Sequence, residues 1–424
     1  MRISLVGLLC VPLVAGAALL RDFVADRSGR TVSLSVFWWG GEKRAQLTEK
    51  ALELYTARHP GVTFRTTWQG NSGYFDKLST MAAGGNAADL FQLDDNYLSE
   101  YAERNVTLDL TKYVKSGGLD LSRFPPSLAA YGDIGGRTVA VAAAENTPGM
   151  IFNRSLLQRL RLPEPTIGMT YPQLLAWATL VTERSGRAVA GTMDPSADYK
   201  AFWLWLRSQG KDLYSGNQLG FTADDLTRWF ELWDDARGSK VTPTVDLIHE
   251  ANTGDVTKQL VVTGKAATSF VWANQLPELQ KSTKDELGVV AYPGDPKGQW
   301  ARASMYWAVS RTSRHPDVVV DVIDFLVNDP DAGRILGTER GLSSNVDVRR
   351  LVDESLTDPS MKASVAFENT MTPLFGPAPA PPPRGHSRIR SGLLTAAENV
   401  QYGKQTPAKA AQDFIAQANR ALAG

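Results

Sequence analysis

Residues 32–95 contain two strand–helix units in succession, and this order constrains the fold more than any other feature of the chain. Residues 32–39 are rich in β-branched and aromatic side chains, as strands are. Apolar residues then recur at helical spacing over residues 42–58, and a second extended run follows at residues 62–68. A strand, a helix and another strand in this order predict a parallel sheet, whose ligands bind at the carboxyl ends of the strands.

Four residues stand at the carboxyl ends of predicted strands. Trp38 and Trp39 close the first strand, where binding is expected more than packing, although one of them suits the core because neighbouring strand residues alternate sides. Asp94 and Asp95 follow a later strand at residues 89–93. Two adjacent acids are costly there unless they are solvated or paired. The alternative role, a helix N-cap, needs only one of them. We therefore expect at least one to accept hydrogen bonds from a ligand.

The bulk composition narrows the classes of protein. At 424 residues the chain is too long for one ordinary core, so we expect two domains. Forty-five basic and forty-five acidic residues cancel, which argues against a nucleic-acid partner. The four histidines lie far apart without a metal-binding pattern, and Gly264-Lys265 lacks the flanking residues of a P-loop. We expect no metal, no cofactor and no ATP site.

The first 30 residues have the pattern of a targeting segment. A positive charge precedes an apolar run from residue 3 to residue 20, and Ala15-Gly16-Ala17 matches a small-x-small cleavage site. Residues 1–30 are therefore predicted to be a signal peptide or an N-terminal membrane anchor. Cys10 is the only cysteine, which excludes an internal disulfide, and the residues before it depart from the usual lipidation motif. We expect export, while cleavage, retention as an anchor and lipidation at Cys10 stay open.

The remainder of the chain alternates between helical and extended patterns. Residues 171–230 are predicted to be mainly helical, and strands are expected at residues 266–272, 288–293 and 305–310. Five prolines at residues 377–383 exclude a helix or a central strand there, so we expect a surface loop.

Short motifs occur in a fixed order along the chain. They are Trp38-Trp39-Gly40-Gly41, residues 72–78 (SGYFDKL), residues 83–89 (AGGNAAD), Gln92-Leu93-Asp94-Asp95, Lys265-Ala266-Ala267, Val271-Trp272-Ala273-Asn274, Ser313-Arg314-His315-Pro316 and Glu339-Arg340-Gly341. In this order they resemble the extracellular solute-binding proteins of carbohydrate ABC importers (family 1, maltose-binding-protein-like). The resemblance covers nearly the whole chain after the targeting segment. The lack of a clear lipidation motif departs from Gram-positive members.

The resemblance implies an α/β, two-lobe fold like that of periplasmic binding proteins, with a hinge and an interlobe cleft. One lobe would combine residues 31–144 with 307–342, and the other would combine 148–302 with 348–424, including the proline-rich loop at 377–383. The chain would cross between the lobes near residues 144–148, 302–307 and 342–348.

The resemblance further implies a binding protein and not an enzyme. Such a protein captures a mono- or oligosaccharide, closes by hinge bending and delivers the sugar to permease subunits in the membrane. Contacts from both lobes are required, because a ligand shifts the open–closed balance only by its differential affinity. We expect a monomer at the extracellular face of the cytoplasmic membrane or in the periplasm, close to the membrane through its N-terminal segment.

A sugar site needs aromatic rings for the C–H faces of the sugar and carboxylate or amide groups for its hydroxyls. By this chemistry and the family motifs, the further candidates are Tyr74, Glu145, Asn146, Tyr199, Trp203, Trp272 and Arg340. Each has a structural alternative, which is packing for the aromatic residues, a turn for the Glu-Asn pair and a helix C-terminal charge for the arginine. Few basic residues occur in this set, so neutral sugars are expected in preference to uronates.

Two other functions stay open. A secreted glycoside hydrolase or polysaccharide lyase would also carry tryptophans and a carboxylate pair. Asp94 and Asp95 are neighbours in sequence, however, and are poorly placed to flank one bond. A receptor for a polyamine, peptide or phosphate ester would share the fold, although the aromatic content and the lack of a basic site argue against phosphate.

Overall fold

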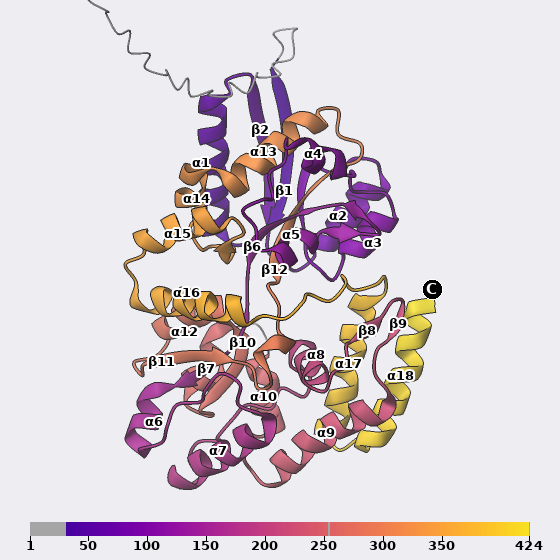
Figure 1. The fold of residues 1–424 in the computed structure, drawn as a ribbon. Helices are drawn as coiled ribbons and strands as arrows, with labels where there is room; N and C mark the ends of the chain where they lie inside the picture. The colour runs from indigo at the N-terminus through magenta and orange to yellow at the C-terminus, as the bar shows by residue number, and fades with distance from the viewer. Residues whose placement is uncertain (1–30, 253–254, 424) are drawn as a thin grey trace, which may run out of the picture.

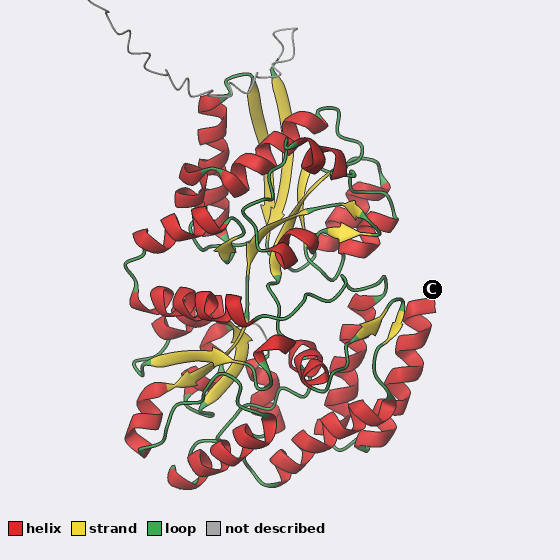
Figure 2. Ribbon diagram, in the orientation of Figure 1, coloured by secondary structure: helices red, strands yellow, loops and turns green. Residues whose placement is uncertain are grey.

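The computed structural model describes residues 31–252 and 255–423, which form two α/β lobes, one above the other in Figure 1. Each lobe has its own β-sheet with helices packed on it, as the colouring in Figure 2 shows. The two-lobe α/β architecture predicted from the sequence is confirmed. The predicted targeting segment, residues 1–30 with Cys10, lies outside the described residues. Within those residues, no helix is long and apolar enough to cross a bilayer.

The upper lobe is built on a six-stranded sheet with the strand order β13-β6-β12-β3-β1-β2. Its strands are β1 (Val32–Trp39), β2 (Val62–Gln69), β3 (Leu90–Leu93), β6 (Val141–Glu145), β12 (Ala303–Val309) and β13 (Leu342–Ser343). β1 pairs in parallel with both β2 and β3, which confirms the parallel arrangement predicted for residues 32–95. β12 lies antiparallel between β3 and β6 and returns from the other lobe.

The two faces of this sheet have separate cores. Leu34, Val36 and Trp38 of β1 share one core with α1 (Glu42–Arg58) and α13 (Pro316–Asn328). Phe37 and Trp39 share the other with α2 (Tyr74–Ala83) and α3 (Leu98–Glu103). The period of two along a strand sends alternate residues to opposite faces, and helices cover both faces here. The other helices of this lobe are α4 (Thr111–Ser116), α5 (Pro126–Ala130), α14 (Pro330–Leu336) and α15 (Val346–Ser355).

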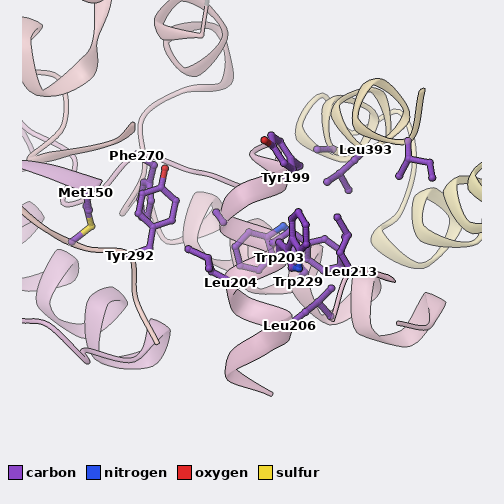
Figure 3. Close-up of a cluster of buried hydrophobic side chains, with 14 of the residues drawn as sticks. Met150, Tyr199, Trp203, Leu204, Leu206, Leu213, Trp229, Phe270, Tyr292 and Leu393 are labelled. Atoms are coloured by element: carbon purple, nitrogen blue, oxygen red, sulfur yellow. The ribbon is translucent and has the colours of Figure 1, made fainter. Parts of the chain in front are cut away.

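The lower lobe has a smaller sheet in which β7 (Pro148–Asn153) lies between β10 (Thr268–Trp272) and β11 (Leu287–Ala291), antiparallel to both. Its longer helices are α6 (Arg154–Leu160), α7 (Tyr171–Arg184), α8 (Tyr199–Ser208), α9 (Ala223–Gly238), α10 (Val245–Ala251), α12 (Leu276–Lys281), α16 (Pro359–Met371), α17 (His386–Gln401) and α18 (Pro407–Ala423). Figure 3 shows aromatic and aliphatic side chains of α8, α9, α17 and the sheet meeting in one core around Trp203 and Trp229.

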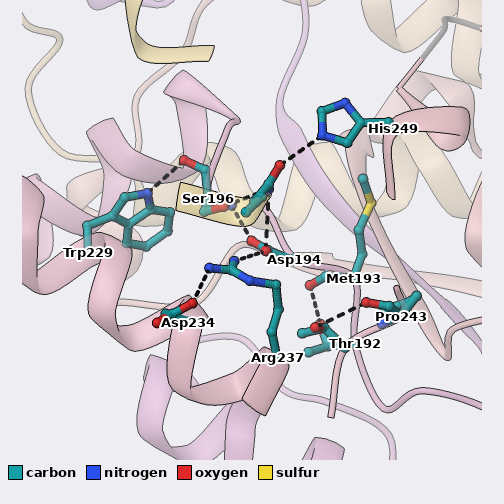
Figure 4. A network of polar contacts seen from close by, with 11 residues as sticks. Thr192, Met193, Asp194, Ser196, Trp229, Asp234, Arg237, Pro243 and His249 are labelled. Carbon is teal, nitrogen blue, oxygen red and sulfur yellow. Dashed lines mark hydrogen bonds and ion pairs between the residues drawn. The ribbon is translucent and has the colours of Figure 1, made fainter. Parts of the chain in front are cut away.

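A buried polar network fixes the helices behind this sheet (Figure 4). The carboxylate of Asp194, which is 1% exposed, pairs with Arg237 of α9 and accepts a hydrogen bond from the backbone N–H of Ser196 at 2.7 Å. The carbonyl of Ser196 in turn accepts the indole N–H of Trp229 at 3.0 Å. Every polar atom in this chain of contacts has a protein partner, so we assign the network to the architecture of the lobe and not to ligand binding.

Three segments connect the lobes. They are residues 146–147 between β6 and β7, residues 292–302 between β11 and β12, and residues 356–358 between α15 and α16. The first two are hydrogen-bonded to each other, since the backbone N–H of Asn146 donates to the carbonyl of Arg302 at 3.0 Å. α15 packs on α14 and β13, so the third connection follows Ser355 instead of falling at residues 342–348. The predicted limits of the lobes otherwise stay a prediction.

The proline-rich segment, residues 377–383, has no helix or strand, as expected, and runs between α16 and α17 (Figure 1). Its backbone is held from both lobes. The carbonyl of Pro382 accepts the hydroxyl of Ser99 in α3 at 2.5 Å, and the carbonyl of Pro377 accepts Arg207 of α8 at 2.6 Å. The segment is therefore a strap that contacts both lobes.

Candidate functional site

Residues from both lobes meet around one guanidinium. Arg302, 3% exposed in the segment before β12, forms an ion pair with Asp95 of the upper lobe. It also donates to the hydroxyl of Tyr199, the first residue of α8 in the lower lobe, at 2.8 Å. Its guanidinium carbon lies 5.4 Å from the ring centre of Trp272, which ends β10. Asp95 follows the end of β3 and Trp272 ends β10, so the two residues come from strands of two different sheets.

Four aromatic rings surround this guanidinium. Besides Trp272, the ring centres of Tyr199, Trp203 and Trp300 lie 5.6, 5.9 and 6.0 Å from the guanidinium carbon of Arg302. We call Asp95, Tyr199, Trp203, Trp272, Trp300 and Arg302 the Arg302 cluster. Contacts of a cation with several ring faces are favourable because each ring presents negative charge on its face.

The two adjacent acids have opposite electrostatic environments. Burial, the largest single effect, would raise the pKa of Asp95, but the charge and hydrogen bond of Arg302 together with the other cationic groups around it lower that pKa overall. Burial and the charge of Asp95 raise the pKa of Asp94 to about 6. One oxygen of Asp94 accepts the backbone N–H of Asn96 at 2.9 Å in the turn before α3. The helix N-cap considered as its alternative is occupied by Tyr97 instead. The carboxylate of Asp95 is therefore paired with Arg302, and the carboxylate of Asp94 is the more basic of the two.

The first turns of α17 add two residues that sequence reasoning missed. The guanidinium carbon of Arg390 lies 4.2 Å from the ring centre of Tyr199. The Nδ1 atom of His386 lies 2.6 Å from the hydroxyl of Tyr214, and burial lowers the pKa of the imidazole to about 3, so this ring is neutral at physiological pH. The spacing of four residues, which places both side chains on one helix face, is the signal that the sequence offered for this pair.

Several buried polar atoms near the cluster lack a hydrogen-bond partner among the described residues. They include the Nε2 atom of His386, the hydroxyl of Tyr306 and the Oδ1 atom of Asn146. The amide nitrogen of Asn146 donates to Asn274 at 3.2 Å, so only its oxygen is left over. Buried polar groups are nearly always paired in folded proteins. Unpaired ones gathered at the junction of two lobes are what a site for a hydroxylated ligand would contain.

Tyr199, Trp203 and Trp272 are brought together as predicted, but Trp203 is mostly a core residue. Its indole is 1% exposed, donates to the carboxylate of Asp212 at 2.5 Å and packs on Trp300 with ring centres 4.9 Å apart. Tyr199 is 8% exposed and Trp272 is partly exposed, and the Nζ atom of Lys200 lies 5.2 Å from the ring centre of Trp272.

The structure places Trp38 and Tyr74 away from the cluster. Trp38 is fully buried in the core with α1 and α13. The hydroxyl of Tyr74 donates to the carbonyl of Gln92 at 2.9 Å and accepts its N–H, and its ring stacks on Phe37 at 4.4 Å. Trp39 packs against the ring of Tyr74 at 5.1 Å, on the face of the sheet opposite Trp38. The core role, considered as their alternative, fits the first two.

Glu145 and Arg340 have structural partners instead of a place in the cluster. The carboxylate of Glu145, at the end of β6, accepts Arg349 of α15 at 2.6 Å with both side chains buried. Arg340 donates to the hydroxyl of Thr48 at 2.8 Å and lies over the ring of Trp307 at 5.1 Å. Burial lowers the pKa of Arg340 to about 9. These two residues tie α15 and α1 to the upper sheet.

The space between the lobes lies beside this cluster. A pocket of about 360 Å³ is lined by Phe124, Pro125 and Pro126 of the upper lobe and by Ala301, Thr372 and Phe375 from the other side. Next to the cluster itself, a cavity bounded by Lys200, Trp203, Trp300 and Arg302 measures only about 10 Å³.

Comparison with known proteins agrees with this architecture. Residues 50–363 match the family model described as bacterial extracellular solute-binding protein. An extracellular solute-binding protein of family 1 from Alicyclobacillus acidocaldarius is 26% identical, with a TM-score of 0.75, over 93% of this chain and 99% of its own.

Two further structures share the fold at lower identity. An oligogalacturonide-binding protein from Yersinia enterocolitica is 20% identical (TM-score 0.75, 92% of this chain and 100% of its own). An ABC substrate-binding protein from Listeria monocytogenes in complex with cycloalternan is 19% identical (TM-score 0.77, 93% and 99%). Because the family model spans most of the chain, which folds into the same two lobes as these structures, the chain belongs to the bacterial extracellular solute-binding proteins.

Proposed function

We propose that this protein is the substrate-binding component of an ABC sugar importer, which captures a mono- or oligosaccharide between its lobes and delivers it to the permease. The observation that carries the proposal is the meeting of Asp95 from the upper lobe with Tyr199 and Trp272 from the lower lobe. A carboxylate for hydroxyls and aromatic faces for C–H groups are the two elements of a sugar site.

The proposed ligand contacts come from both lobes. Asp94 and Asp95 are the hydroxyl acceptors, Asn146 offers an unpaired oxygen, and Tyr199 and Trp272 are the stacking platforms. We add Arg390, whose guanidinium lies over Tyr199. We leave out Trp38, Tyr74, Glu145 and Arg340, because the structure places each of them in a core or in a contact away from the Arg302 cluster. Trp39, which packs on Tyr74, and Trp203, which packs on Trp300, are core residues of their lobes and are not proposed as platforms.

The charges favour an uncharged ligand. The carboxylates of Asp94 and Asp95 face the guanidinium groups of Arg302 and Arg390, so two negative and two positive charges balance before any ligand enters. A uronate would add a negative charge to a balanced site. We therefore keep the expectation of a neutral sugar, although one relative of this fold binds an oligogalacturonide.

Capture proceeds by lobe closure in this proposal. The cluster lies where two hydrogen-bonded connections pass between the lobes, so a small rotation about them separates Asp95 from Tyr199. A sugar that contacts both sides favours the closed form by its extra contacts there. No catalytic step is proposed, because Asp94 and Asp95 leave the same strand and face one side of any ligand. The N-terminal segment is proposed to direct export and to keep the protein near its permease.

A thermal-shift screen tests the proposal. The protein from residue 31 onward is heated with mono- and oligosaccharides, amino acids, polyamines and phosphate esters. A sugar at about 100 times its Kd stabilises the native state by about 2.7 kcal/mol, which raises Tm by several degrees. The variant Trp272→Ala should lose the shift, and Trp68→Ala, an exposed tryptophan on β2, should keep it. A shift with amino acids or phosphate esters and none with any sugar would overturn the carbohydrate assignment.

A further inference from the structure

Arg302 contacts the same groups that the proposed function assigns to the sugar. Its guanidinium pairs with the carboxylate of Asp95 and donates to the hydroxyl of Tyr199 at 2.8 Å. The same group lies 5.4 Å from the ring centre of Trp272. The carboxylate that would accept from sugar hydroxyls and the hydroxyl of Tyr199 are thus occupied by a side chain of the protein itself. Arg390, at 4.2 Å from the ring centre of Tyr199, and Lys200, at 5.2 Å from that of Trp272, lie near the same two rings.

A guanidinium offers contacts of the same kind as a pyranose ring. It is planar, so its face stacks on aromatic rings, and its N–H groups point outward from the rim toward acceptors. A pyranose likewise stacks through a C–H face and donates from hydroxyls at its rim. Trp203 and Trp300, at 5.9 and 6.0 Å from the guanidinium carbon, complete the enclosure.

The remaining space excludes simultaneous binding. The cavity beside Lys200, Trp203, Trp300 and Arg302 measures about 10 Å³, which is at the lower limit for one water molecule. Arg302 lines this cavity, and its guanidinium also holds the carboxylate of Asp95 and the hydroxyl of Tyr199, so a sugar ring can bond to those two groups only after the guanidinium leaves. The backbone of Arg302 need not move, because its carbonyl is anchored by the N–H of Asn146 at 3.0 Å. Rotation about the side-chain torsions of the arginine is sufficient to clear the platform.

We propose, on the basis of the proposed function, that Arg302 is an internal competitor which occupies the ligand platform in the unliganded protein and sets its affinity. The bound sugar takes over the ring faces and the carboxylate of Asp95, and the guanidinium swings aside. The apparent affinity is then the intrinsic affinity reduced by the fraction of molecules in which the platform is free. A smaller residue at this position should raise the affinity instead of abolishing it.

The first experiment is chemical rescue, which does not depend on knowing the sugar. In Arg302→Ala the guanidinium is deleted, and added methylguanidinium should fill the vacated cage and raise Tm. Methylurea, which has a similar shape and no charge, should not. Arg207→Ala is the matched control, because Arg207 also lies over Trp300, at 5.0 Å, but is held by Asp212 and by the carbonyls of Gly298 and Pro377. If methylguanidinium leaves the Tm of Arg302→Ala unchanged, the inference is overturned.

The second experiment measures competition by calorimetry with glucose, maltose, maltotriose and digalacturonic acid. A sugar that binds the unaltered protein should bind Arg302→Ala about tenfold more tightly, which corresponds to about 1.4 kcal/mol. Methylguanidinium should weaken that binding again. Arg302→Gln, which keeps hydrogen-bond donors for Asp95 and Tyr199 but no charge for the rings, should bind more tightly too and replaces the alanine variant if that one does not fold.

The outcomes distinguish a failure of the inference about Arg302 from a failure of the proposed carbohydrate function. Weaker sugar binding by both Arg302 variants would make Arg302 a direct ligand contact and overturn the inference. Rescue by methylguanidinium, with none of the four sugars bound by any variant, would establish the cage and count against the carbohydrate assignment alone.

Discussion

The buried ion pair between Glu145 and Arg349 gives the sharpest test of how the lobes are joined. Glu145 ends β6 immediately before the first connection, and Arg349 lies on α15 immediately before the third. Their side chains are 0% and 6% exposed and their charged atoms lie 2.6 Å apart. The second carboxylate oxygen of Glu145 has no other hydrogen-bond partner among the described residues. Arg349→Met would therefore leave the buried carboxylate of Glu145 without its charged partner.

The expected cost follows from this burial. Removing one partner of a buried pair costs about 3–5 kcal/mol, because the remaining charge keeps its desolvation penalty without its compensation. For a lobe of roughly 200 residues, each kcal/mol lowers Tm by about 2–4 °C, so a fall of roughly 10 °C is expected at pH 7.5. Glu145→Gln combined with Arg349→Met removes both charges and should be more stable than Arg349→Met alone.

Thermal unfolding followed by circular dichroism, with urea unfolding as a second probe, measures the four proteins of this double-mutant cycle. A surface pair of the same type, Arg123 with Asp347, is the matched control: its side chains are about half exposed, so Arg123→Met should cost less than about 1 kcal/mol. The reasoning fails if Arg349→Met is as stable as Arg123→Met. It also fails if the double variant is no more stable than Arg349→Met.

Three further predictions concern single groups. Because the pKa of Asp94 is raised to about 6, affinity for a responding sugar should fall as pH drops from 7 to 5 while that carboxylate takes up a proton, and calorimetry on Asp94→Asn should find no such dependence. The pKa of Glu368 is raised well above 4.5 by burial and by Glu145, so the folded protein retains a proton that the unfolded chain has lost. Its stability should fall as pH rises above 4.5, and a series of Tm measurements on Glu368→Gln should give a flatter curve. Tyr74→Phe leaves backbone groups of Gln92 unpaired and should cost about 1–3 kcal/mol in urea unfolding without changing sugar affinity; a loss of affinity at unchanged stability would restore Tyr74 to the ligand site.

The local sequence pattern was sufficient to predict the helices and strands of the first half of the upper lobe. The helix expected at residues 42–58 is α1 (Glu42–Arg58), and the strand–helix–strand order around it gives the parallel pairing of β1 with β2. Apolar periodicity and helix-breaking residues act within a few positions of the chain, so they can be recognised in a single sequence. The position of α15 depended on packing against α14 and β13, which no local pattern encodes.

Trp38 shows the limit of predicting ligand contacts from strand ends. The carboxyl end of a parallel strand is exposed to ligands only if no helix covers it. Both faces of β1 are covered, by α1 and α13 on one side and by α2 and α3 on the other, so Trp38 is buried although it stands at the predicted edge. Asp94 and Asp95 lie beyond the end of β3, where the covering helices stop, and they reach the junction of the lobes.

The contacts of Arg302 could not be predicted from the sequence, because they join residues that are far apart in the chain. It lies more than 200 positions from Asp95 and about 100 from Tyr199 in the chain, and its neighbours form no motif. The sequence does not show which of the 45 basic residues will be buried beside a carboxylate. What identifies it is the simultaneous approach of two lobes and one connecting segment, a property of the tertiary fold.

The two buried ion pairs that involve connecting elements have a common physical meaning. Asp95 with Arg302 and Glu145 with Arg349 each contribute little net stability relative to apolar side chains of the same size, because desolvation offsets most of their attraction. What such a pair contributes is geometric specificity. The two charges are compensated only at close approach, and the free energy rises steeply when they are separated without access to water. Glu145 with Arg349 limits the relative positions of β6 and α15, and Asp95 with Arg302 limits the position of a connecting segment against the upper lobe. Glu145 with Arg349 lies within the upper lobe, whereas Asp95 with Arg302 joins the upper lobe to a connecting segment from which Arg302 also donates to Tyr199 of the lower lobe. A protein that binds by closure needs one pair of each kind, since a hinge works only between rigid bodies and a site empties only if its contacts can be exchanged.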